Sequence, residues 1–136
     1  MNLFGVTDVG RVRRDNQDSY AIRRIGEGAA LLVVCDGMGG ARAGSVASSV
    51  AVEAFTQAVE AAMAGGIPED LALREQALCE ACRVANEKVH RLSLENREYE
   101  GMGTTLVAAL AASGSVCFIN VGDSRGYVLS NSSIHQ

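Results

Sequence analysis

The stretch LLVVCDGMGGARAG, residues 31–44, decides how this chain is interpreted. An apolar run typical of a buried strand ends on an acid, Asp36, and four glycines follow within eight residues. A strand end holds a carboxylate in a defined position, and glycine lets a ligand or another segment of backbone approach closely. The pattern therefore indicates either a tight turn or a binding site at the end of a strand.

Three interpretations of this stretch compete. A dinucleotide-binding turn is disfavoured, because Arg42 stands where the third glycine of GxGxxG belongs and a carboxylate would repel a pyrophosphate. A purely structural turn, with Asp36 capping the next helix, accounts for one glycine better than for four. The third interpretation is a site for Mg²⁺ or Mn²⁺, which prefer carboxylate and carbonyl oxygens such as those of Asp36 and its neighbour Gly37.

Two further stretches favour the metal site. VRRDNQDSY, residues 12–20, places Asp18 shortly after Arg13, and INVGDSRGY, residues 119–127, ends another apolar run on Asp123. An arginine beside acids is typical of a site that binds phosphate opposite a metal, although an ordinary surface salt bridge is the alternative for residues 12–20. We expect Asp18, Asp36 and Asp123 to form an acidic cluster at one edge of the fold.

Composition excludes several classes of protein. The chain has 136 residues, enough for one ordinary domain, and its net charge of −4 provides no basic surface for nucleic acid. No stretch is apolar enough for a membrane segment, and the N-terminus lacks the apolar core of an export signal, so we expect a cytoplasmic protein. The cysteine pair 79 and 82 lies within a helical pattern without a second ligand pair, which predicts four free thiols rather than a zinc site.

The hydrophobic pattern predicts strands, then two long helices, then strands. We expect strands at residues 2–7, 19–25, 29–36, 104–112, 115–123 and 125–131, with a hairpin turn at 26–28. The helices are predicted from about residue 43 to 61, and from a first turn containing Pro68 to about residue 96. Charged residues of the second helix, Arg74 among them, are expected on a solvated face. This order predicts an α+β fold with antiparallel sheets and helices packed outside.

Four stretches carry a resemblance to a known family. TDVGRVRRDNQDSY (7–20), VVCDGMGGARAGSVAS (33–48), GMGTTLVAAL (101–110) and VGDSRGYVL (121–129) resemble, in order, the motifs of bacterial PP2C-type (PPM) metal-dependent protein serine/threonine phosphatases. The resemblance implies an antiparallel β-sandwich flanked by antiparallel helices, a four-layer α-β-β-α arrangement. It also implies that residues 1–136 are the N-terminal part of a single domain that continues in relatives.

The resemblance assigns roles to particular residues. It implies that Asp36 bridges two metal ions, that the Gly37 carbonyl binds one of them, and that Asp18 orients metal-bound water. It implies that Arg13 grips the substrate phosphate and that Asp123 serves an additional metal ion.

Neighbouring positions receive lesser roles. Thr104 and Thr105 match strand residues near the site and are expected to be structural. Gln17 stands where many relatives have a glutamate that binds metal through water.

The implied activity is hydrolysis of phosphoserine and phosphothreonine in proteins by water activated between two metals, without a side-chain nucleophile. The implied cofactors are Mn²⁺ or Mg²⁺, two or three ions in the complete domain. Phosphoproteins are the expected partners, together with a cognate Ser/Thr kinase. The alternative is a catalytically incomplete domain that acts as a binding module. We expect the isolated chain to hydrolyse little or no phosphate ester, and either to self-associate or to be partly molten.

Overall fold

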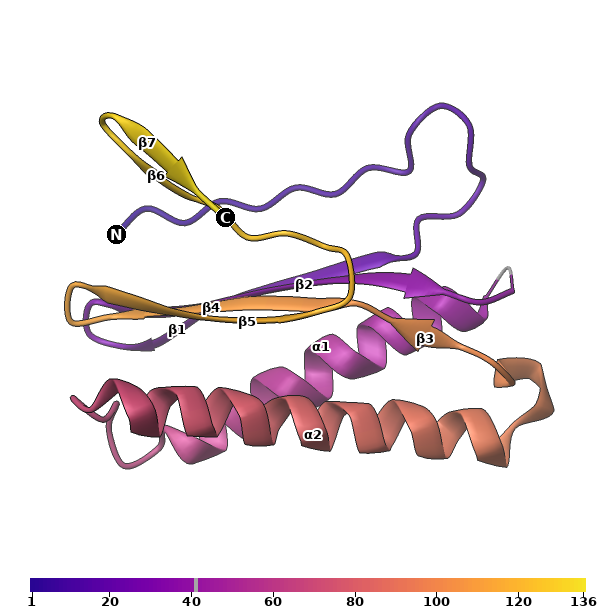
Figure 1. Ribbon diagram of the computed structural model, residues 1–136. Helices are drawn as coiled ribbons and strands as arrows, with labels where there is room; N and C mark the ends of the chain where they lie inside the picture. The colour runs from indigo at the N-terminus through magenta and orange to yellow at the C-terminus, as the bar shows by residue number, and fades with distance from the viewer. Residues whose placement is uncertain (41) are drawn as a thin grey trace.

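The computed structural model describes residues 1–40 and 42–136 (Figure 1). Along the chain, the described residues form two strands, then two long helices, then five further strands. The elements are β1 (Asp18–Gly26), β2 (Ala29–Met38), α1 (Ala43–Ala62), α2 (Leu71–Glu95), the 3-10 turn η1 (Arg97–Tyr99), β3 (Gly103–Thr104), β4 (Leu106–Ala112), β5 (Ser115–Val121), β6 (Val128–Ser130) and β7 (Ser133–His135).

The main sheet has five antiparallel strands. Its order is β1-β2-β4-β5, and the short β3 continues the pairing along the end of β2. The predicted hairpin is confirmed: β1 and β2 turn at residues 27–28. The strands β4 and β5 form a second hairpin that turns at residues 113–114. The α+β class with antiparallel sheets is therefore confirmed.

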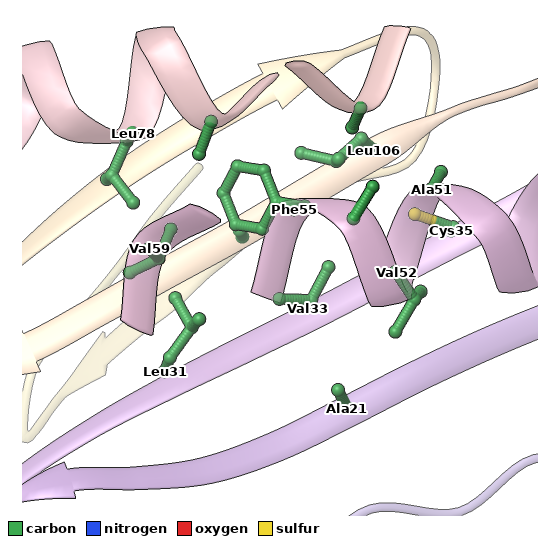
Figure 2. Packing of buried hydrophobic residues seen from close by; sticks show 14 of the residues in the cluster. Ala21, Leu31, Val33, Cys35, Ala51, Val52, Phe55, Val59, Leu78 and Leu106 are labelled. Carbon is green, nitrogen blue, oxygen red and sulfur yellow. The ribbon is translucent and has the colours of Figure 1, made fainter. Parts of the chain in front are cut away.

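Both helices cover one face of this sheet, and the core lies between them and the strands (Figure 2). Side chains alternate along β2, so that Leu31, Val33 and Cys35 are buried against the helices while Val34 is exposed on the other face. The same alternation turns Asp36 away from the helices. The end of β2 thus presents its acid on the face that no helix covers.

That second face carries the remainder of the chain. The N-terminal segment and the β6–β7 sheet lie over it, on the side of the main sheet opposite α1 and α2 (Figure 1). Tyr20, Val34, Val116 and Phe118 remain between 41% and 47% exposed there. Of the four layers implied by the resemblance, the described residues thus form one helical layer, one five-stranded sheet and a separate two-stranded sheet.

The prediction of a strand at residues 2–7 was wrong. This segment is extended, but within the described residues it joins no sheet ladder. It is attached through side chains instead: the Tyr20 hydroxyl donates to the Gly5 carbonyl at 3.3 Å, and Arg24 donates to the Met1 carbonyl at 3.2 Å. A strand pattern predicts an extended backbone, whereas a strand also needs a partner.

The prediction that Arg74 lies on a solvated face of the second helix was also wrong. Its side chain is 1% exposed and lies between the start of α2 and the β4–β5 hairpin. The guanidinium donates to the Pro68 carbonyl at 2.5 Å, to the Ala112 carbonyl at 3.0 Å and to the Ser115 hydroxyl at 2.9 Å. Backbone carbonyls and a hydroxyl therefore satisfy a buried charge that the helical pattern placed among solvated residues.

The second helix begins later than predicted. Asp70 is its N-cap and accepts a hydrogen bond from the Ala72 amide at 2.9 Å, so Pro68 precedes the helix rather than occupying its first turn. In the described part of the chain, no helix combines the length and apolar character needed to cross a bilayer.

Candidate active site

Two acids from neighbouring strands meet at one end of the sheet. Asp18 begins β1 and lies directly opposite Asp36 in the β1–β2 register, so both side chains project from the same face. Partial burial, the negative charge of Asp36 and a hydrogen bond with its carboxyl group raise the pKa of Asp18, while Arg13 acts in the opposite direction. The hairpin therefore holds two carboxyl groups in mutual contact beside a cation.

The glycines near Asp36 allow three backbone segments to pack against one another. The Gly37 amide donates to the Gln17 carbonyl at 3.1 Å, which joins the end of β2 to the segment before β1. A Cβ atom at Gly37 would lie 2.0 Å from the carbonyl oxygen of Gly44 in α1. Because the N–H and C=O of a strand residue point to the same side, the Gly37 carbonyl also faces the segment before β1.

An open cleft of about 600 Å³ surrounds these groups. Four of the predicted site residues line it: Arg13, Asp36, Gly37 and Asp123. The other residues of its lining are Arg14, Asp15, Gln17, Met38, Gly39 and Thr105.

The fifth predicted residue, Asp18, lines a neighbouring groove of about 410 Å³ that the sheet forms with residues 4–8. Its contact with Asp36 places Asp18 at the border between groove and cleft. The structure thus brings Arg13, Asp18, Asp36, Gly37 and Asp123 to the same end of the sheet.

Hydroxyl groups hold the main chain of Asp36. Its carbonyl accepts from the Thr105 amide at 2.9 Å and from the Thr104 hydroxyl at 3.0 Å, and its amide donates to the Thr105 hydroxyl at 2.9 Å. The Thr105 hydroxyl lies 2.7 Å from that of Ser124. Sequence reasoning considered the two threonines but missed Ser124, whose only signal was its position directly after Asp123.

The carboxylate and carbonyl oxygens of this site are the kinds of ligand that a hard divalent cation binds. Burial first, and then the negative charge of Asp36, raise the pKa of Asp18, and a bound cation would offset the repulsion between the two carboxylates when both are ionised. Within residues 1–40 and 42–136, however, no three side chains of His, Cys, Asp or Glu come close enough together to hold a metal ion. Carbonyl oxygens, water or other residues would have to complete the coordination.

Comparison with known proteins agrees with this picture. Residues 11–136 match the family described as protein phosphatase 2C. The serine/threonine phosphatase stp of Listeria welshimeri is 38% identical over 130 residues, which cover 96% of this chain and 50% of that protein.

Solved structures agree as well. The structure of serine/threonine phosphatase Stp1 from Staphylococcus aureus is similar with a TM-score of 0.84 and 38% identity, over 96% of this chain and 50% of that one. The catalytic domain of the serine/threonine protein phosphatase PstP, in complex with 2 manganese ions, is similar with a TM-score of 0.75 and 34% identity, over 92% of this chain and 49% of that one. The chain thus spans about half the length of these relatives. From its sequence match and its fold together, the chain belongs to the protein phosphatase 2C family.

Proposed function

We propose that residues 1–136 are the N-terminal part of a domain that hydrolyses phosphoserine and phosphothreonine in proteins with the help of Mn²⁺ or Mg²⁺. The observation that carries the proposal is that Asp18 lies opposite Asp36 at the end of the sheet, where Asp36 shares one cleft with Arg13 and Asp123. The names of the relatives, serine/threonine phosphatases, support the reaction class. The two manganese ions of the PstP catalytic domain support the cofactor.

Each residue of the site has a proposed role. Asp36 is the primary metal ligand, and Asp18, Asp123 and the Gly37 carbonyl contribute further oxygen donors. Bound divalent ions would supply an activated water molecule and neutralise charge on the phosphate. Asp18 orients the attacking water, because its carboxylate can accept a hydrogen bond next to Asp36. Arg13 binds two oxygens of the phosphate with its planar guanidinium.

The metal site is tested by titration with Mn²⁺. Asp36→Asn removes one charged ligand and should weaken Mn²⁺ binding at least tenfold, which is about 1.4 kcal/mol. Glu27→Gln is the matched control, since it makes the same change of charge in the exposed turn at the opposite end of the hairpin. Calorimetry should show that this control binds like the wild type. Equal affinity in the Asp36→Asn variant would refute the assignment.

The substrate site is tested by hydrolysis of a phosphothreonine peptide in the full protein that carries residues 1–136. Arg13→Ala should raise KM with little change in melting temperature, because Arg13 is exposed and has no described packing role. Arg11→Ala is the control, since Arg11 lies in the same segment but does not line the cleft. A KM that is unchanged, or equally raised by the control, would contradict the role of Arg13.

A second candidate function is a binding module that does not hydrolyse phosphate. It is favoured by one observation, namely that the described residues do not bring three acidic ligands together. Mn²⁺ binding without turnover of phosphopeptide would support it. The cognate kinase and the cytoplasmic location stay predictions.

A further inference from the structure

The hydrogen-bond pattern between β2 and its partner strands becomes irregular at Thr105. Strand β2 pairs with β3 and with β4 in one continuous register, so that Asp36 and Thr105 face each other. In a regular pair of this kind, each residue donates its N–H to the carbonyl of the other. The Thr105 amide does donate to the Asp36 carbonyl at 2.9 Å, but the Asp36 amide donates to the Thr105 hydroxyl instead, also at 2.9 Å. A side-chain oxygen has replaced a backbone carbonyl opposite the candidate metal ligand.

The carbonyl that Thr105 would have used is otherwise engaged. The Thr104 hydroxyl lies 3.0 Å from the Thr105 carbonyl and 3.0 Å from the Asp36 carbonyl. The amide and carbonyl groups of Asp36 and Thr105 thus all have hydrogen-bond partners, and three of these contacts involve a threonine hydroxyl. This arrangement depends on a hydroxyl group at both positions.

The Thr105 side chain also holds the segment that carries Asp123. The Thr105 hydroxyl lies 2.7 Å from the Ser124 hydroxyl, and its methyl group packs on Gly122, where an added Cβ would come within 2.8 Å of it. Gly122 has a φ of +100°, which favours glycine, so this close approach is built into the backbone. Both neighbours of Asp123 therefore contact Thr105, which is only 7% exposed.

We propose that Thr105 is a positioning residue that sets the place of Asp123 relative to Asp36, with Ser124 as its partner. The inference rests on the proposed function, since it concerns the acids assigned there to metal binding. The Thr105 hydroxyl accepts from the Asp36 amide and forms a second hydrogen bond with the Ser124 hydroxyl, in which either group can donate. One buried hydroxyl group thus links the strand end that carries Asp36 to the loop that carries Asp123.

The test separates the hydroxyl of Thr105 from its methyl group. Thr105→Val keeps the shape but removes the hydroxyl, whereas Thr105→Ser keeps the hydroxyl but removes the methyl group. We expect Mn²⁺ affinity, measured by calorimetry, to fall about tenfold in Thr105→Val and to stay within about twofold of wild type in Thr105→Ser. A merely structural role would instead make the affinities of both variants follow their melting temperatures.

A second readout needs no metal. Amide hydrogen exchange at Asp36, followed by NMR in the metal-free protein, should become faster in Thr105→Val and stay near the wild-type rate in Thr105→Ser. If Thr105→Val does not fold, Ser124→Ala replaces it: this variant keeps the hydroxyl opposite Asp36, frees the Asp123 segment, and should still weaken Mn²⁺ binding about threefold or more.

The outcomes are distinguishable from a failure of the proposed function. Wild-type binding of Mn²⁺ that neither Thr105→Val nor Ser124→Ala changes would overturn the inference alone. A Thr105→Ser variant as weak as Thr105→Val would also overturn it, because the hydroxyl would then not be the active group. Failure of the wild type to bind Mn²⁺ would overturn the proposed function, and an unchanged amide exchange rate in Thr105→Val would then overturn the hydroxyl link as well.

Discussion

Gly37 offers a sharp test of how the site is built. A Cβ atom there would lie 2.0 Å from the Gly44 carbonyl oxygen, 2.5 Å from its carbon and 2.8 Å from the Gln17 carbonyl oxygen. All three are backbone atoms, which cannot turn away as a flexible side chain could. Real Cβ contacts are essentially never shorter than 3.0 Å, so Gly37→Ala must separate β2 from the start of α1 by about 1 Å.

The cost of this movement can be worked from its parts. Overpacking by one methyl group costs about 1–3 kcal/mol where side chains can adjust, and more where backbone has to move. Loss of the hydrogen bond from the Gly37 amide to the Gln17 carbonyl adds about 1 kcal/mol. The lower entropy of alanine in the unfolded chain returns only about 0.4–1 kcal/mol. We therefore expect Gly37→Ala to lower the free energy of unfolding by about 3 kcal/mol or more.

Gly40→Ala is the matched control. Gly40 lies in the bend just after β2, its φ is outside the left-handed region, and an added Cβ meets no atom of the described residues within 4 Å. Its free energy of unfolding should stay the same or rise by about 0.4–1 kcal/mol. Urea denaturation followed by circular dichroism measures both variants. If the two differ by less than about 1 kcal/mol, the close packing of the three segments is refuted.

Three further predictions follow from single side chains. Arg74→Met should lower the free energy of unfolding by about 2 kcal/mol, because the charged hydrogen bonds of Arg74 to two carbonyls are lost. The control Arg83→Met changes an exposed arginine and should leave the urea midpoint nearly unchanged. Equal effects of the two substitutions would contradict the stabilising role of the buried Arg74. The pKa of Asp18 is raised by folding, so the metal-free wild type should lose stability as pH rises through the window between its unfolded and its raised folded pKa. Asp18→Asn should abolish that loss in melting curves recorded across this window, and an unchanged pH dependence would count against the contact with Asp36. Burial raises the pKa of the Cys35 thiol to about 12, so a thiol reagent at pH 7 should modify the exposed Cys79 first and reach Cys35 only after unfolding; early modification of Cys35, detected by mass spectrometry, would disprove its burial.

Local features of the sequence sufficed for the elements and for the candidate acids. The apolar run at residues 29–36, the strand pattern at residues 19–25 and the tight turn at 26–28 predicted the first hairpin, because such short runs bounded by a glycine turn are typical of paired strands. Helical spacing predicted α1 to within a residue or two at each end. Asp36 and Asp123 stood out because each ends an apolar run on a carboxylate, and such a signal is contained within a few neighbouring residues.

Other features depend on which segments meet in space, and only the tertiary structure decided them. The segment 2–7 has a strand pattern but no ladder partner within the described residues. Arg74 is buried because the β4–β5 hairpin folds over the start of α2, about forty residues away along the chain. The exchange of a carbonyl for a hydroxyl at Thr105 requires Asp36, Thr105 and Ser124 to meet from three separate segments. A sequence pattern reports the periodicity of one segment, whereas burial, pairing and close backbone contact depend on the partner that folding brings beside it.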